Sequence, residues 1–263
     1  MRLRRIMAVI LAHGGKEFFD KAEILEVVFW WLCDVLLLGF LSKSFGALTG
    51  NALFGSLIIV SVITMRPTVI RGAMTMARLI IDELSGNMFL ATLATPITRT
   101  EWTVASMIIS FLQAVLRLIL GYLLIFLLFD INVFSFGFAL LATIPFFVIS
   151  GWIIGFLTSA CVYIVGKRSI TQLQVLSFSF IALCGVYSPV SALPIALQKV
   201  SWCLPVTYIL TGLREHILTG VSIWPFLLKN LALNMFYALI ALIILYLAFR
   251  HAKQRGLAHL ETK

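Results

Sequence analysis

Two ionisable side chains lie inside long apolar stretches of the sequence, where a charge is costly. Asp34 falls in one such stretch, and Arg117 falls in another, with Gln113 one helical turn before it. If these stretches cross a membrane, such charges must face a partner or a water-filled cavity, and they mark substrate or ion pathways. We therefore predict that Asp34 and Arg117 pair or jointly line a wet cavity. The alternative is that Arg117 meets the anionic head of a substrate.

Little else in the sequence is suited to carry out a reaction. Gly15-Lys16 lacks the glycine spacing and the following Ser or Thr of a phosphate-binding loop. The four histidines and four cysteines are scattered, without the spacing of a metal or redox motif, and no Ser/His/Asp set stands out. We predict that this chain has no metal site, binds no cofactor and is not an enzyme. Any ATP hydrolysis must then come from another chain.

Composition indicates where these residues reside. Hydrophobic residues make up 61% of the chain and charged residues 12%, whereas a soluble domain is about half apolar and a quarter charged. The apolar runs do not alternate with polar residues, so helices rather than barrel strands must satisfy the backbone groups in hydrocarbon. We predict an all-α integral membrane protein.

The net charge of +9 is concentrated on one side of the predicted spans. Most of the 20 basic residues precede the first span, flank the long polar segment after the second, or follow the last. By the positive-inside rule both termini are cytoplasmic, and anionic headgroups of the lipid bilayer, not nucleic acid, are the partners of these charges. The absence of disulfide patterning and of a cleaved leader favours a multi-pass protein of a prokaryotic inner (plasma) membrane.

Six apolar segments are expected to cross the bilayer within a single transmembrane domain over residues 1–263. They cover about residues 25–41, 51–65, 102–129, 136–165, 170–187 and 225–249. A short external loop is predicted over 42–50. The second span should continue as a helix to Leu84, with the side chain of Arg66 snorkelling to the inner surface. Residues 1–23 mix basic and apolar side chains, which predicts an amphipathic helix in the cytoplasmic interface.

The polar segment between the second and third spans has an apolar centre. Residues 84–97 are predicted to form a short cytoplasmic helix, bounded by Pro96 because the residue before a proline avoids helical geometry. Phe89, Leu90 and Leu93 fall on one face of that helix. Such a face requires a partner protein or, alternatively, lies on the lipid headgroups.

Two further patterns concern packing. Residues 189–220 are too broken by proline to cross the membrane, and Pro194 and Pro205 should start two short helices. We favour re-entry of this segment into the outer leaflet over a plain loop with two surface helices. Gly151 and Gly155 form a small-xxx-small pattern in the fourth span, for which packing within the chain is favoured over a dimer interface.

Three motifs, in order along the chain, resemble those of the type-2 export permeases, the membrane subunits of ATP-binding cassette transporters. They are Trp31–Phe40 in the first span, Glu83 and Gly86 with the run Phe89–Pro96, and an outer region with Gly185–Val190, Leu193-Pro194, Leu204–Tyr208 and Leu213-Arg214. The resemblance covers nearly the whole chain. It departs from the family at Ser85-Gly86-Asn87, where many members carry Gly-Thr followed by Glu.

The resemblance implies a half-transporter. A second copy of the chain, or a close paralogue, would complete the pathway, and separate nucleotide-binding subunits would use ATP and Mg²⁺. The 84–97 helix would be a coupling helix seated on the ATPase subunit, with Glu83, Arg99 and Glu101 as its polar rim. The implied ATPase contacts are Glu83, Gly86, Phe89, Leu90, Leu93, Thr95, Pro96 and Arg99. The residues assigned to the translocation pathway are Asp34, Arg117, Tyr187, Ser188 and Pro189.

The function implied by the resemblance is ATP-driven export of a hydrophobic or amphipathic substrate, drug-like or lipid. Export of a lipid-linked polysaccharide is the alternative substrate class. A secondary transporter without an ATPase would need charged relays through several spans, and only Asp34 and Arg117 qualify. A third hypothesis is an assembly or anchoring protein, in which the 84–97 helix is a docking site alone.

Overall fold

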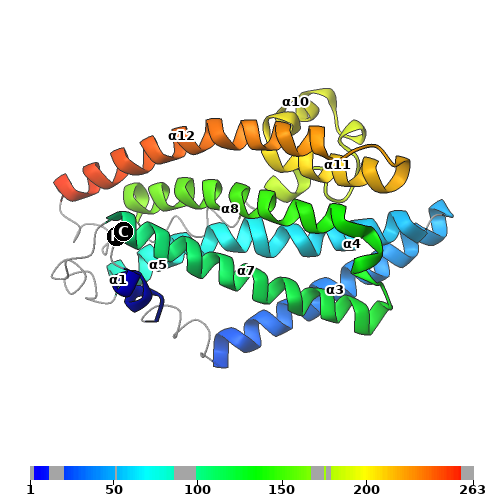
Figure 1. Cartoon of the computed structure of the whole chain (residues 1–263), viewed down its shortest axis with the longest axis horizontal. Coiled ribbons are helices and arrows are strands. Elements are labelled where there is room, and N and C mark those ends of the chain that lie inside the picture. The colour runs from blue at the N-terminus through cyan, green and yellow to red at the C-terminus, as the bar shows by residue number, and fades with distance from the viewer. Residues whose placement is uncertain are drawn as a thin grey trace.

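The computed structural model describes residues 3–11, 21–50, 52–85, 99–166, 175 and 179–255. Within these residues every regular element is a helix, and the long helices form an elongated bundle (Figure 1). Five helical stretches within the described residues are long and apolar enough to cross a membrane, namely Val28–Leu48, Gly55–Ile81, Thr100–Phe129, Val133–Val165 and Trp224–His251. The prediction of an all-helical chain with several candidate membrane spans is confirmed. The sixth predicted span, 170–187, lies largely outside the described residues.

The long helices account for most of the described chain. They are α3 (Lys21–Thr49), α4 (Ala52–Met65), α5 (Gly72–Ser85), α7 (Arg99–Phe129), α8 (Gly137–Val165) and α12 (Trp224–Arg255). The shorter ones are α1 (Leu3–Val9), the π-helical η2 (Arg66–Arg71), the 3₁₀ helices η3 (Val133–Phe136) and η4 (Val190–Ala192), α10 (Ile195–Cys203) and α11 (Pro205–Thr219). The predicted third, fourth and last spans each fall within one of the candidate spans.

The helix ends gather at two ends of the bundle (Figure 1). At one end α1 packs on the start of α7, Val162 of α8 meets the end of α5, and Tyr163 of α8 meets Phe249 of α12. At the other end lie α10 and α11. The first and last described helices thus share an end with the helices that flank residues 86–98. If both termini lie on one side of a membrane, as predicted, the first and last helices must end on the same side of the bundle.

α3 continues to Thr49, so the prediction of an external loop over 42–50 is wrong. The hydroxyl of Ser44 donates to the carbonyl oxygen of Phe40, 2.9 Å away and one turn earlier. Ser42 is buried against Gly55 of α4, where a Cβ would overlap the Ser42 carbonyl oxygen. Serines that bond back to the helix, or that sit at a close helix crossing, do not interrupt an apolar helix.

α4, η2 and α5 form one continuous helix at the centre of the bundle. In the most apolar stretch of this helix 83% of the residues are buried, whereas the corresponding shares are 29% in α3 and 17% in α12. At ~1.5 Å per residue this helix is roughly 50 Å long, which exceeds the ~30 Å of a hydrocarbon core. Its end at Ser85 agrees with the predicted continuation to Leu84.

Residues 66–71 of this central helix are wound as a π-helix, and Pro67 explains why. Proline has no N–H to donate, so the ladder of hydrogen bonds between residues four apart must be rearranged here. The amide of Gly72 donates to the carbonyl oxygen of Pro67, five residues back. Arg66 and Arg71 therefore lie on adjacent turns of one face, whereas in an α-helix positions five apart diverge by about 140°.

α7 runs beside α5 and is held to it by buried polar side chains. The hydroxyl of Thr75 donates to the side-chain oxygen of Gln113 at 2.7 Å, and Ser110 donates to a backbone carbonyl of α5 at 3.0 Å. Trp102, near the start of α7, packs against the apolar cluster at the end of α5. Residues 86–98 therefore connect two helix ends that lie side by side.

The two glycines of α8 pack against the central helix of the same chain. A Cβ at Gly151 would overlap the backbone of Thr68, and one at Gly155 would overlap the sulfur of Met76. Close approach of this kind is what a small-xxx-small pattern permits. Packing within the chain, which we favoured over a dimer interface, is confirmed for both glycines.

Gly151→Leu is expected to lower the free energy of unfolding by about 1–3 kcal/mol or more, as overpacking does. The group that it meets is the backbone of Thr68, which cannot swing aside as a side chain would. The shift of the thermal unfolding midpoint in detergent measures the effect. Ala232→Leu adds bulk at an exposed position of α12 and should leave the midpoint unchanged. Equal midpoints for the two variants would contradict the close crossing.

Pro194 and Pro205 begin α10 and α11, the two short helices predicted for residues 189–220. Pro194 is the N-cap residue of α10, and Pro205 is the first residue of α11. α11 packs against α12 and α8. The side-chain amide of Asn230 in α12 donates to the carbonyl oxygen of Pro205 at 2.8 Å. α11 is thus fixed to the bundle, and the outer position of this segment and its re-entry into a membrane stay predictions.

The N-terminal helix packs on the bundle within the predicted amphipathic segment 1–23. α1 buries Ile6 and Val9 against the first turns of α7. Arg5 forms an ion pair with Glu101 at 3.9 Å. Glu101 is only 3% exposed, and its carboxylate meets α1. Its assignment to the polar rim around the coupling helix stays a prediction, because residues 86–98 lie outside the described residues.

Candidate functional site

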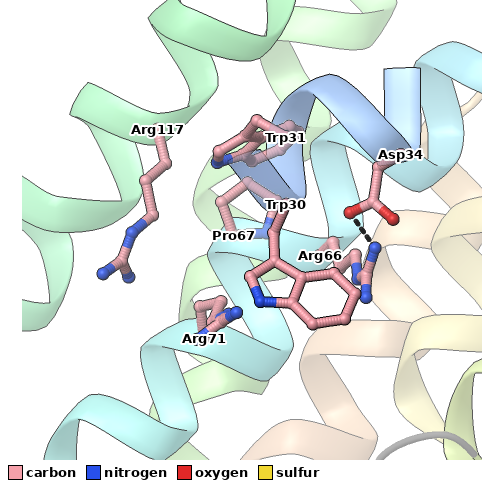
Figure 2. A pocket seen from close by; sticks show the side chains of 7 residues that line it. All are labelled: Trp30, Trp31, Asp34, Arg66, Pro67, Arg71 and Arg117. Atoms are coloured by element: carbon pink, nitrogen blue, oxygen red, sulfur yellow. Dashed lines mark ion pairs between the residues drawn. The ribbon is translucent and has the colours of Figure 1, made fainter. Parts of the chain in front are cut away.

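A charged pocket opens where α3, η2 and α7 meet, within three of the candidate spans (Figure 2). Its empty volume is about 310 Å³, which includes the open mouth. The side chains that line it are Trp30, Trp31, Asp34, Arg66, Pro67, Arg71 and Arg117. Three of these side chains are cationic and one is anionic, so the lining carries an excess of positive charge.

Asp34 pairs with Arg66 and not with Arg117. The ion pair joins the carboxylate on α3 to the guanidinium on η2 (Figure 2). Each of the two side chains is 22% exposed, so the pair is largely removed from solvent. The predicted pairing of Asp34 with Arg117 is therefore wrong, and the snorkelling of Arg66 to the inner surface stays a prediction. The other alternative, that Asp34 and Arg117 line one cavity, agrees with the lining of the pocket.

Two adjacent tryptophans and a second arginine of η2 complete the pocket. Trp31 is 7% exposed and belongs to the core, whereas Trp30 is 48% exposed. Arg71 follows Arg66 on the adjacent π-helical turn, and it lies close enough for the two charges to repel one another. Within the described part of the chain no three His, Cys, Asp or Glu side chains are grouped as a metal site requires. Charges and aromatic faces of this kind suit recognition of a ligand.

Tyr187, one of the three residues at 187–189 assigned to the pathway, lies near the pocket. Its side chain lies within electrostatic range of Arg66 and is 43% exposed. Ser188 is partly buried and Pro189 is exposed beside it. None of the three is among the residues that line the pocket. The structure thus brings Asp34 and Arg117 to one cavity and the outer residues to its neighbourhood.

Arg214 of α11 fixes the outer segment that carries Tyr187. Its guanidinium donates to the carbonyl oxygens of Gly185 at 2.9 Å and Val186 at 3.4 Å. Gly185 has a φ of 76°, in the left-handed region that favours glycine. Burial lowers the pKa of Arg214 below its usual value, and the two carbonyl oxygens offset part of that desolvation. The arginine that the resemblance places in this region therefore acts as a clamp.

Two groups of polar residues within the bundle were not predicted from the sequence. Asn234 of α12 donates at 2.9 Å both to the hydroxyl of Ser150 in α8 and to the side-chain oxygen of Asn230. Two asparagines one turn apart in an apolar helix are a signal of such a network. Arg66 and Arg71 of the pocket form the second group, and their signal is a pair of arginines around a proline inside an apolar helix.

The residues assigned to the ATPase contact lie at or beyond the ends of α5 and α7. Glu83 is in the last turn of α5, and Arg99 is the first residue of α7. The others lie outside the described residues; they are Gly86, Phe89, Leu90, Leu93, Thr95 and Pro96. The helices on either side of the predicted coupling helix are therefore placed, and its contact with an ATPase stays a prediction.

No protein-family model matches the chain, and no curated protein matches it. The resemblance to the type-2 export permeases therefore depends on the three motifs named above. The geometry that bears on it consists of the charged pocket among the long helices and the paired ends of α5 and α7.

Proposed function

We propose that this chain is the permease subunit of an ATP-binding cassette transporter of the type-2 export class. It would form the translocation pathway with a second copy of itself or with a close paralogue, in the inner membrane of a prokaryote and with both termini in the cytoplasm. The chain would bind no cofactor and catalyse no reaction of its own. ATP and Mg²⁺ would be used by separate nucleotide-binding subunits.

The observation that carries this proposal is the pairing of α5 with α7 at one end of the bundle. α5 continues past Ile81, where its candidate span ends, to Ser85, and α7 begins at Arg99. The hydrogen bond from Thr75 to Gln113 ties the two helices together. A soluble partner that binds the segment between two such ends can move both helices as rigid bodies.

The central helix links the Ser85 end of α5 to the charged pocket. α4, η2 and α5 are continuous, so a displacement of the Ser85 end is transmitted to Arg66 and Arg71 on the same helix. Motion of this helix relative to α3 alters the contact between Arg66 and Asp34, and with it the opening of the pocket. Closure of an ATPase dimer would in this way expose the pathway to one side and then to the other.

The cargo that we propose is hydrophobic or amphipathic, drug-like or lipid. This class is supported by a pocket that places the half-exposed indole of Trp30 next to charged groups within the candidate spans. A lipid-linked polysaccharide, whose carrier is also amphipathic, is the alternative cargo.

Co-purification with a soluble ATPase tests the proposal directly. The tagged full-length chain from its native host is expected to elute with a nucleotide-binding subunit, and the reconstituted complex should hydrolyse ATP. Transport of cargo by vesicles that contain this chain and no ATPase would overturn the proposal in favour of a secondary transporter. A complex that hydrolyses ATP and moves no cargo would leave the anchoring role instead.

A further inference from the structure

The pocket gathers three cationic side chains within the candidate spans, where charged groups mark substrate or ion pathways. Asp34 is the one carboxylate among its seven lining side chains, against three guanidinium groups. Arg66 and Arg71 repel one another across adjacent turns. Clustered positive charge between low-dielectric walls attracts anions. The lining therefore favours an anionic ligand over a neutral or cationic one.

Arg66 is the arginine at which a ligand would be exchanged. Arg71 and Arg117 have further interactions of their own, whereas Arg66 forms its ion pair with the carboxylate of Asp34. A guanidinium binds carboxylate and phosphate oxygens through the same planar fork. The oxygens of Asp34 thus occupy on Arg66 the position that the oxygens of an anionic ligand would take.

Trp30 indicates what is attached to that anionic group. Its side chain is 48% exposed and lines the same pocket as the arginines of η2 (Figure 2). An indole offers a large apolar face on which a hydrocarbon or aromatic body can lie. A headgroup on Arg66 and an apolar body against Trp30 together describe an amphipathic anion.

We propose that the pocket binds the anionic headgroup, a phosphate or a carboxylate, of an amphipathic substrate, and that Asp34 takes the place of this headgroup when no substrate is bound. The guanidinium of Arg66 is then paired in both states, so the empty pocket holds no bare charge on that residue. A neutral molecule does not displace Asp34, which gives the site its selectivity. Because it names the class of cargo, this proposal rests on the proposed transport function.

Binding of radiolabelled dodecyl phosphate tests the exchange. The full-length chain is placed in phosphatidylcholine nanodiscs without an ATPase subunit or ATP. Asp34→Asn should bind the probe more tightly than the wild type, because the competing carboxylate is gone. Asp34→Asn/Arg66→Gln, which has neither charge of the pair, should bind it about tenfold more weakly than Asp34→Asn, as loss of a charge-assisted contact predicts.

Two further variants keep the test independent of the ion pair. Arg71→Gln leaves Asp34 and Arg66 in contact and should weaken binding severalfold. Arg250→Gln makes the same chemical change at an exposed position near the end of α12 and should bind as the wild type does. Size-exclusion chromatography checks that each variant is folded. Equal binding by Asp34→Asn and the double variant, or wild-type binding by Arg71→Gln, would overturn the proposal.

Competitors distinguish the sources of the anion. Phosphatidic acid and oleate should displace the probe, whereas inorganic phosphate and dodecyltrimethylammonium should not. Displacement by inorganic phosphate at equal concentration would identify a site for the free ion and overturn the amphipathic class. Failure of binding in this assay is also separable from failure of the transport proposal, because the latter would appear as the absence of an ATPase partner.

Discussion

Leu90→Asp is expected to abolish the stimulation of ATP hydrolysis by substrate and to leave insertion into the membrane intact. On the proposed function Leu90 is an apolar anchor of the coupling helix, together with Phe89 and Leu93. Seating a carboxylate in an apolar groove strips it of water without a partner, and an unpaired buried charge is among the most costly groups in a protein. The ATPase subunit would then no longer bind the segment between α5 and α7.

ATP hydrolysis by the complex in vesicles, with and without substrate, measures this effect, and membrane fractionation reports insertion. Leu11→Asp is the matched control, because it places the same charge on a leucine that is 70% exposed just after α1. Substrate-stimulated hydrolysis at the wild-type rate in Leu90→Asp would remove the coupling role from residues 84–97. The main support for the permease assignment would go with it.

Arg66→Leu is expected to lower the free energy of unfolding by about 3–5 kcal/mol, because it leaves the carboxylate of Asp34 without a partner. That side chain is 22% exposed, so water replaces the lost guanidinium only in part. Asp34→Leu/Arg66→Leu should recover most of the loss, since a buried ion pair and an apolar pair of similar volume differ little in stability.

Thermal unfolding of the purified variants in one detergent compares these free energies. Glu215→Leu, which removes an exposed carboxylate from α11, is the control and should leave the midpoint unchanged. A double variant that unfolds as early as Arg66→Leu would contradict the pairing of Asp34 with Arg66. The cost of Arg66→Leu would then have to come from packing around η2.

Most helices of the fold could be predicted from the residues at their ends. Charged and polar residues mark the ends of apolar spans, and proline favours the first turn of a helix. Pro194 and Pro205 mark the starts of α10 and α11, as proline does when its missing N–H is not needed. The error at residues 42–50 arose because serine and lysine were read as loop residues. In α3 the hydroxyl of Ser44 bonds back to Phe40, so the helix continues.

The candidate site could be predicted only in part. Position along a span can be counted in residues, and for that reason Asp34 and Arg117 were correctly placed at one cavity. The direction of a side chain depends on how each helix is rotated against its neighbours, which no count along one segment reveals. The π-helical winding after Pro67 brings Arg66 and Arg71 to the pocket together, and a rule built on ~3.6 residues per turn separates them.

The winding of η2 also limits how the gene can change in length. One residue of helix corresponds to about 100° of rotation and ~1.5 Å of advance. A codon lost or gained between positions 66 and 71 would therefore turn all of α5 against α4, and Thr75 would no longer face Gln113. Substitutions within these positions do not change the rotation of α5 relative to α4. Natural variation here should consist of replacements and be nearly free of insertions and deletions.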